Sequence, residues 1–134
     1  MRILLDANVL FTAAHNPDGK AALVIGMGSE GYFPLFTSNV ASEEAKRNIT
    51  VKYPKSLRQL DDLISRITLI AADLSAPFPD TLPQKDAVIF QAAIACRATH
   101  LLTGDLRHFG SFMNRPENTY SITVHTVGEF LDSI

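Results

Sequence analysis

The sequence has 134 residues, of which 46% are hydrophobic and 19% are charged. This length is typical of one domain and the composition excludes a disordered or fibrous chain, so we expect a single domain over residues 1–134. The formal net charge of −2 excludes a uniformly basic nucleic-acid binder, because phosphate binding needs concentrated Lys and Arg. Any contact with a nucleic acid would be made by a local patch.

The single cysteine and the N-terminal residues indicate a cytoplasmic protein. Cys96 cannot form an intramolecular disulfide, and it lies in the apolar run AVIFQAAIACRA, where a thiol packs as a small hydrophobic group. The opening MRILLDANVLF is too short to span a bilayer and lacks the cleavage site of an export signal. We therefore expect a reducing compartment and no membrane segment.

Short apolar runs alternate with longer segments of helical period. Strands are predicted at residues 2–5, 33–38, 67–72, 99–104 and 121–126. Helices are predicted at residues 7–14, 19–29, 39–51, 55–66, 84–98 and 127–133. Thr126 and Glu129 have the spacing of a capping box at the start of the last helix.

Strands separated by helices favour an α/β fold, in which a parallel sheet of about five strands has helices on both faces. The apolar runs before Asp6 and Thr103 suit central strands, whereas the alternating ITVHT suits an edge strand. Ligands of such sheets bind beyond the carboxyl ends of the strands. Polar residues at those ends are therefore the candidates for a functional site.

Two predicted strands are followed by aspartate, namely Asp6 after RILL and Asp105 after HLLTG. Taken singly, Asp6 could cap the helix that starts at Ala7, and Asp105 could be a turn residue after Gly104. Two carboxylates at adjacent strand ends repel one another, however, and a fold that places them together usually holds a cation or shifts a pKa.

A third acid, Asp86, lies in the first turn of the segment QKDAVIFQAAIACRA. Small and apolar residues surround most of this helix, which predicts a buried, central position near the sheet. The helix dipole and the free backbone donors of a first turn also favour a carboxylate there, so a structural role is equally well supported.

The fourth candidate comes from SNVASEEAKRNI, in which helical spacing separates two adjacent glutamates. Glu43 has Lys46 and Arg47 at the spacing of solvent-side ion pairs and is predicted to lie on the surface. Glu44 shares a face with Val40, Ala41, Asn48 and Val51, which predicts a position at the margin of the buried face. A carboxylate there needs a partner, because burying it alone is unfavourable.

These residues carry a resemblance to the PIN-domain family along nearly the whole chain, in the segments LLDANVL, SEEAKRNI, KDAVIFQAA and LLTGDLRHF. The resemblance implies a three-layer Rossmann-like fold and an acidic site for one or two Mg²⁺ or Mn²⁺ ions. The acids at the positions of the family's metal site are Asp6, Glu44, Asp86 and Asp105. Asn8 and Thr103 stand in supporting positions, and no acid is missing.

Such residue types suit hydrolysis of a phosphodiester. Mg²⁺ takes a few carboxylates, keeps waters and leaves positions for phosphate oxygens, as an in-line displacement of the 3′ oxygen requires. We expect Asp6 and Asp105 to be the principal ligands, with Asp86 and Glu44 completing the site directly or through water. Thr103 would hydrogen-bond a carboxylate, or is simply a β-branched strand residue.

Other features support further expectations. The run GMGSEG follows a helical segment and is interpreted as a helix stop rather than a phosphate-binding loop. The histidines lack zinc-like spacing, whereas Arg107 and His108 could meet an RNA phosphate or could simply be solvated. The basic stretch KRNITVKYPKSLR, with Tyr53 available for stacking, could guide RNA or form a solvated surface.

Three functions from different classes remain. The resemblance implies an endoribonuclease that acts on RNA as the toxin of a toxin–antitoxin pair, with a cognate antitoxin protein as partner. The alternative is a PIN domain that binds RNA or a protein without cutting. A metal-dependent phosphatase or other hydrolase on a similar parallel sheet is the third, although DANVL lacks an Asp-x-Asp-x-Thr pattern at Asp6. The apolar content of helices 55–66 and 19–29, with the resemblance, also predicts a homodimer.

Overall fold

The computed structural model describes residues 1–134, in which five short strands form one parallel sheet. The strands are β1 (Ile3–Leu5), β2 (Leu35–Ser38), β3 (Thr68–Ile70), β4 (His100–Leu102) and β5 (Thr123–His125). The helices are α1 (Ala7–His15), α2 (Lys20–Ser29), α3 (Asn39–Lys52), α4 (Leu57–Ser65), α5 (Gln84–Ala95), α6 (Leu106–Phe109) and α7 (Val127–Ser133). The predicted α/β fold class is confirmed.

The strand order is β3-β2-β1-β4-β5, so the first strand of the chain lies at the centre of the sheet. Ile3 stands opposite Leu35 of β2 on one side and opposite His100 of β4 on the other. The order reverses at β1, and the crevice at such a switch point is where ligands bind in sheets of this kind. The alternating segment ITVHT forms β5 at the edge, as predicted.

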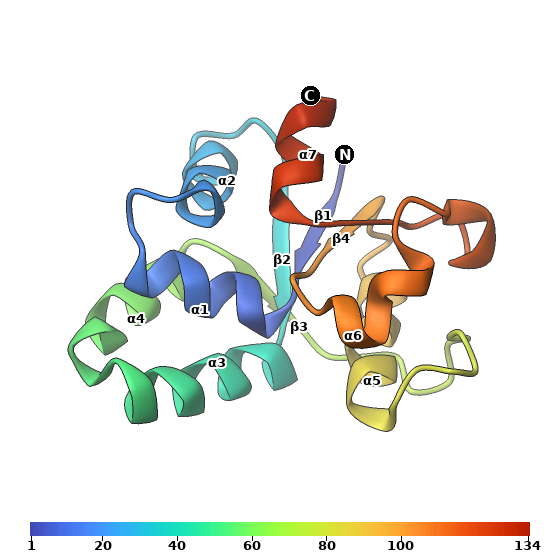
Figure 1. Ribbon diagram of the computed structural model, residues 1–134, viewed down its shortest axis with the longest axis horizontal. Helices are drawn as coiled ribbons and strands as arrows, with labels where there is room; N and C mark the ends of the chain where they lie inside the picture. The colour runs from blue at the N-terminus through green and yellow to red at the C-terminus, as the bar shows by residue number, and fades with distance from the viewer.

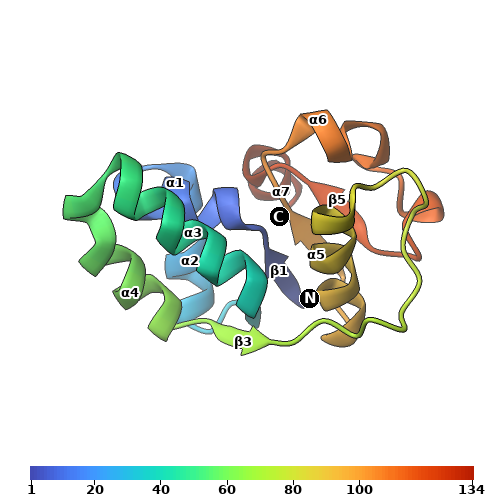
Figure 2. The same ribbon diagram turned by 90° about the horizontal axis from the view of Figure 1, so that it is seen from below.

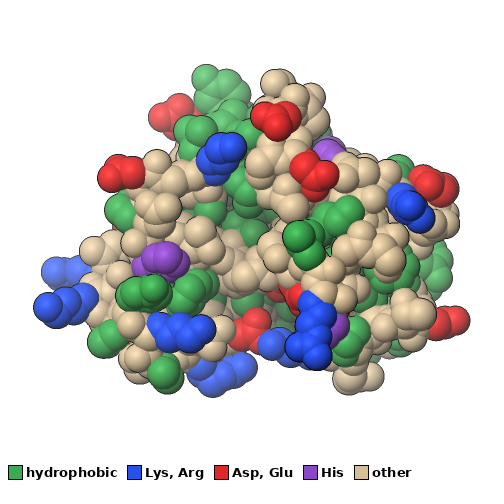
Figure 3. Space-filling model, in the orientation of Figure 1, with side chains coloured by type: hydrophobic (Ala, Val, Ile, Leu, Met, Phe, Trp, Pro, Cys, Tyr) green, Lys and Arg blue, Asp and Glu red, His purple; other side chains and the backbone are tan.

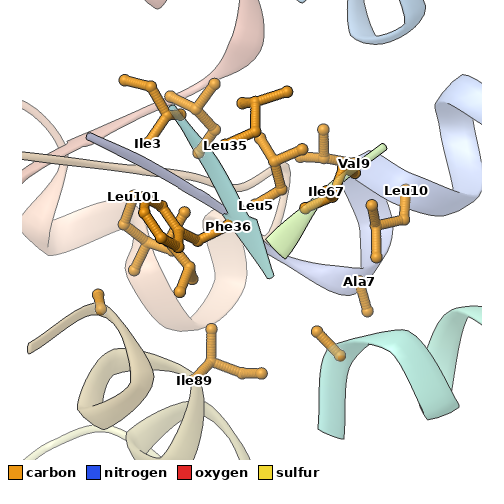
Figure 4. Packing of buried hydrophobic residues seen from close by; sticks show 14 of the residues in the cluster. Ile3, Leu5, Ala7, Val9, Leu10, Leu35, Phe36, Ile67, Ile89 and Leu101 are labelled. Atoms are coloured by element: carbon orange, nitrogen blue, oxygen red, sulfur yellow. The ribbon is translucent and has the colours of Figure 1, made fainter. Parts of the chain in front are cut away.

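The molecule has three layers (Figures 1 and 2). Helices α1, α2, α3 and α4 gather on one side of the sheet, and α5 covers the other side. Alternate residues of the central strands supply the two faces: Phe36 and Leu101 point toward Ile89 of α5, whereas Ile3 and Leu35 point the other way (Figure 4). None of the helices is long and apolar enough to cross a membrane.

Capping side chains start the helices at the carboxyl edge of the sheet. The Asp6 carboxylate accepts a hydrogen bond from the backbone of Ala7, and the Ser38 hydroxyl accepts one from Ala41 at the start of α3. At α7 both hydrogen bonds of the predicted capping box between Thr126 and Glu129 are present. Strand residues therefore lead directly into helices at the edge where ligands are expected.

The predicted elements differ from the structure mainly after Asp105. The segment 106–118 contains α6 and the 3-10 turns Gly110–Phe112 and Pro116–Asn118, none of which was predicted. The helix predicted over 84–98 ends at Ala95, because Arg97 adopts a left-handed backbone with φ of 55°. The strand predicted over 121–126 begins only at Thr123, since Ser121 has φ of 67°.

The glycine-rich run of residues 26–31 closes α2 as predicted, although the helix continues through Gly26 and Gly28 to Ser29. A Cβ atom on Gly28 would lie 2.3 Å from Cδ1 of Leu35. Only glycine at this position lets α2 approach β2 so closely. The run therefore has a packing role, and it does not lie at the carboxyl edge of the sheet.

Candidate active site

Asp6 occupies the turn between β1 and α1 and is almost completely buried. Its Oδ1 atom accepts a hydrogen bond of 2.7 Å from the backbone N–H of Ala7. Its Oδ2 atom accepts one of 2.8 Å from the hydroxyl of Thr103, which follows β4. Asp6 is therefore both the predicted helix cap and a carboxylate held in place from the neighbouring strand.

Burial raises the pKa of Asp6 to about 6, because a charged carboxylate loses hydration inside the fold. The hydrogen bonds from Thr103 and Ala7 act in the opposite direction, since they favour the charged form. The negative charges of Glu44 and Asp86 raise the pKa further. A cation beside Asp6 would relieve both the desolvation and the repulsion.

Asn8 and Thr103 form a polar clamp around Asp6. The side-chain amide of Asn8 donates to Asp6 Oδ2 and to Thr103 Oγ1, each at 3.2 Å, while its oxygen accepts from the backbone N–H of Gly104 at 2.7 Å. Thr103 Oγ1 also accepts from the backbone N–H of Asp105 at 3.1 Å. These contacts tie the end of β1 to the end of β4, which fits the supporting positions expected for Asn8 and Thr103.

The His108 side chain contacts the carboxylates of both Asp105 and Asp86. Asp105 caps α6, where its Oδ1 atom accepts a hydrogen bond of 3.2 Å from the backbone N–H of His108. The Nδ1 atom of His108 lies 2.9 Å from Asp105 Oδ2 and 2.9 Å from Asp86 Oδ2. Burial raises the pKa of the Asp86 carboxyl and the Asp105 charge raises it further, while the nearby His108 lowers it.

Glu44 faces the other acids from α3 and forms an ion pair with Lys85 of α5. The carboxylate side chain is 18% exposed and the lysine side chain is 64% exposed, so the pair lies at the mouth of the site. Contact with Glu44 raises the pKa of Lys85. Lys85 was not predicted as a site residue, although its place beside Asp86 in the first turn of α5 is a signal for it.

Glu44 is half-buried as predicted, but the helix face predicted to bury it is not an apolar one. Ala41 is buried, but Val40 and Val51 are 43% and 81% exposed. Glu44 is half-buried because α3 lies beside α5, where Lys85 accompanies Asp86. Glu43 is exposed as predicted, yet it makes no ion pair with a basic residue.

The four predicted acids thus converge at the carboxyl ends of the central strands. Figure 3 shows acidic atoms at the lower centre of this face, beside Lys, Arg and His side chains. Asp86, Asp105 and His108 each offer a ligand atom within 4.8 Å of the other two, and Asp6 and Glu44 lie outside that group. Carboxylate oxygens with an imidazole nitrogen form a donor set that fits a divalent metal ion.

His108 follows Asp105 closely in sequence and is therefore a candidate contact for an RNA phosphate. The structure instead turns its Nδ1 atom toward the two carboxylates, whereas the neighbouring Arg107 is exposed and makes no ion pair. Tyr53, expected to be available for stacking, already stacks on His15 with ring centroids 4.5 Å apart. The basic stretch of residues 46–58 forms the far end of α3 and the start of α4.

A surface groove of about 410 Å³ begins at Asn8, which hydrogen-bonds Asp6. It shares Asn8 and Gly104 with the polar clamp and extends between α1, α2 and α7 to Lys20. No carboxylate lines this groove, and Lys20 makes no ion pair. The groove therefore contains one unpaired cationic side chain and no acidic one.

The sequence pattern of the PIN domain matches residues 2–107 of this chain, which therefore belongs to the PIN-domain family. The matched stretch contains all four acids of the candidate site and ends one residue before His108. A search of curated proteins found no match.

Solved structures with the same fold include two of VapBC proteins. The chain matches VapBC2 from Rickettsia felis, solved with a DNA fragment from its promoter, with a TM-score of 0.69 and 16% identity over 94% of this chain and 98% of that one. It matches VapBC-1 from nontypeable Haemophilus influenzae with a TM-score of 0.60 and 15% identity over 96% and 99% of the two chains. A PilT N-terminus domain protein from Sulfolobus solfataricus P2 matches with a TM-score of 0.55 and 14% identity over 99% and 92%. At these identities the likeness establishes the fold.

Proposed function

We propose that this PIN-domain protein is an endoribonuclease that depends on Mg²⁺ or Mn²⁺. The observation that carries the proposal is the convergence of Asp6, Glu44, Asp86 and Asp105 at the switch point of the sheet, where each is coupled by charge to another acid. Membership of the PIN-domain family supports the same function. Asp6 and Asp105 are proposed as principal ligands, with Asp86 and Glu44 completing the site.

Neighbouring groups of the chain hold the carboxylates of the site in position. Thr103 and Asn8 fix the orientation of Asp6, and the α6 backbone fixes that of Asp105. A divalent ion bound among the carboxylates would supply Lewis-acid stabilisation of the phosphate and a nucleophile at neutral pH. Glu44, at the margin of the site, or Asp86, which is buried within it, would orient the attacking water.

The substrate is proposed to be single-stranded RNA that lies along the groove from Gly104 to Lys20. Lys20 would neutralise a phosphate of the bound chain, as a local basic contact in a protein of acidic net charge. The preference for RNA over DNA is inferred from the family alone, because no contact in the site distinguishes the two nucleic acids.

The likeness to VapBC complexes supports the further proposal that the protein is a toxin with a cognate antitoxin. A homodimer is proposed as its free state. The alternative is a PIN domain that binds RNA or a protein without cutting. Such a protein would have the same fold but would not hydrolyse the phosphodiester bond.

Incubation with a panel of end-labelled RNAs tests the nuclease against this alternative. We expect cleavage with Mg²⁺ or Mn²⁺ and none with Ca²⁺, whose larger, flexible coordination shell does not hold the reacting atoms in line. Products should carry 5′-phosphate and 3′-hydroxyl ends, because water and not the 2′-hydroxyl attacks the phosphate. Asp105→Asn should abolish cleavage, and Asp132→Asn, a change of an exposed acid on α7, should not. Full activity in excess EDTA would refute the metal-dependent mechanism.

A further inference from the structure

His108 lies at the edge of the candidate site, and its ring is turned inward. Its Nδ1 atom is 2.9 Å from an oxygen of Asp86 and 2.9 Å from an oxygen of Asp105. We propose that His108 supplies a nitrogen ligand to the divalent ion, and that the site therefore favours Mn²⁺ over Mg²⁺. The inference rests on the proposed function only in assuming that the acids hold an ion.

The spacing of the three atoms suits a shared ion. Neighbouring ligands of an octahedral ion with bonds of about 2.1 Å lie roughly 3 Å from each other. Both measured distances from Nδ1 agree with that separation, and all three candidate atoms fall within 4.8 Å. The same side chains that now contact one another could thus contact one ion.

The position of His108 is coupled to that of Asp105. The backbone N–H of His108 donates to Asp105 Oδ1, and α6 places the two residues three positions apart, on one helical face. Phe109, the next residue, is completely buried and anchors the turn in the core. A ring held in this way loses little additional freedom when it binds an ion.

An imidazole nitrogen changes which ion the site prefers. Mg²⁺ binds oxygen ligands almost exclusively, whereas imidazole suits transition-metal ions. The carboxylates serve both kinds of ion, so His108 is the member of the set that distinguishes them. A site of carboxylates alone would lack this discrimination.

Pulsed EPR of bound Mn²⁺ in the absence of RNA tests the assignment directly. We expect electron spin echo modulation from a directly bound imidazole nitrogen in the wild-type protein and in a His15→Gln control, whose changed residue lies at the end of α1. Labelling with [¹⁵N]histidine should alter the modulation without any substitution, so the test does not depend on a variant that folds. Bound Mn²⁺ without nitrogen modulation would overturn the proposal.

Affinity measurements supply a second readout. His108→Gln should remove the modulation and weaken Mn²⁺ binding at least about tenfold, as expected for loss of a ligand or its support. Mg²⁺ binding, measured by competition, should change by less than about threefold. Equal weakening of both ions would overturn the proposal, because His108 would then act through the carboxylates alone.

RNA cleavage is assayed separately, so the two proposals can fail independently. Nitrogen modulation without cleavage would refute the nuclease and support His108 as a ligand. Cleavage by a protein whose Mn²⁺ shows no nitrogen modulation would support the nuclease and refute the ligand.

Discussion

The hydroxyl of Thr103, at the end of β4, donates a 2.8 Å hydrogen bond to the Asp6 carboxylate at the end of β1. Both groups are buried, and the bond joins two neighbouring strands at their carboxyl edge. Hydrogen bonds to a charged acceptor are stronger than neutral ones and favour the ionised carboxylate. Thr103 therefore holds Asp6 in position and lowers its pKa, against the larger effect of burial, which raises it.

Replacement of this hydroxyl should raise the pKa of Asp6. Thr103→Val keeps the shape but removes the donor, so we expect the pKa to rise above its present value of about 6. The free energy of unfolding should fall by about 1–3 kcal/mol, because Asn8 and Asp105 also lose an acceptor. NMR titration of ¹³C-labelled aspartate carboxyls measures the pKa. Thr103→Ser is the control that keeps the donor, and an unchanged pKa in Thr103→Val would contradict the assigned role.

The raised pKa of Asp6 makes the metal-free fold less stable as pH increases. The native state retains a proton on Asp6 that the unfolded chain has released, in the window from about pH 4 to about pH 6. Stability from this group is fully present below the window and is lost as pH passes through it. The shift from 3.8 to about 6 corresponds to roughly 3 kcal/mol.

Asp6→Asn should remove this pH dependence. Asparagine can still cap α1, and its altered hydrogen bonds cost about 1–2 kcal/mol relative to the protonated carboxyl. In EDTA near pH 8 the variant should therefore be as stable as wild type or slightly more stable, whereas near pH 4 it should be less stable. Urea unfolding at the two pH values measures the difference.

With Mn²⁺ present near pH 8, wild type should be more stable than Asp6→Asn. Ion binding to the native state raises its stability by mass action, and a variant that lacks a principal ligand should gain much less. Melting curves of Asp6→Asn and wild type, with and without Mn²⁺, supply the comparison. Equal Mn²⁺ shifts, together with a variant that melts well below wild type in EDTA near pH 8, would show that Asp6 is only a helix cap.

Glu44 and Glu43 form a matched pair for testing the site. Glu44→Gln should reduce the rate of RNA cleavage at least about tenfold, since Glu44 faces Lys85 and the other acids. Glu43→Gln should leave the rate close to wild type, because that side chain is exposed and unpaired. Lys85→Met reports how much of the Glu44 effect comes from the ion pair. The opposite pattern for the two glutamines would exclude Glu44 from the site.

The structure leaves less exposed apolar surface for the predicted homodimer than the sequence suggested. Within α4, Leu60 and Ile64 are buried in the chain's own core, so this helix does not supply the apolar surface that was expected. Leu23 of α2 remains 54% exposed, and Tyr32, shortly after the end of that helix, remains 69% exposed. Sedimentation at micromolar concentration should give twice the monomer mass of 14.7 kDa, and Leu23→Ser should shift it toward the monomer. A wild-type mass near 14.7 kDa would exclude the dimer.

The strand ends and first helical turns were predictable because local sequence determines them. Asp6 and Asp105 follow apolar runs, and Asp86 begins a segment of helical period, so their arrival at one edge follows from a parallel sheet. The capping box of Thr126 and Glu129 is likewise a local pattern. These features depend on few contacts between distant parts of the chain.

The details of the site depend on tertiary packing and could not be predicted in this way. The pairing of Glu44 with Lys85 requires α3 and α5 to lie side by side across the end of the sheet. The direction of the His108 ring follows from α6, a helix of only four residues that has no detectable periodicity. Sequence pattern therefore pointed to the acids and to His108 beside them, but not to Lys85 or to the inward direction of the His108 ring.

The central place of β1 has a consequence for synthesis of the chain. Asp6 and Thr103 are 97 residues apart in sequence, and β1 completes its pairing only when β4 is available. Contacts of such separation form late, because the intervening chain must first be ordered or looped out. A nascent chain that stops before residue 100 lacks one neighbour of its central strand as well as Asp105. The chain therefore acquires the second neighbour of its central strand and its complete set of acids in the same late step of translation.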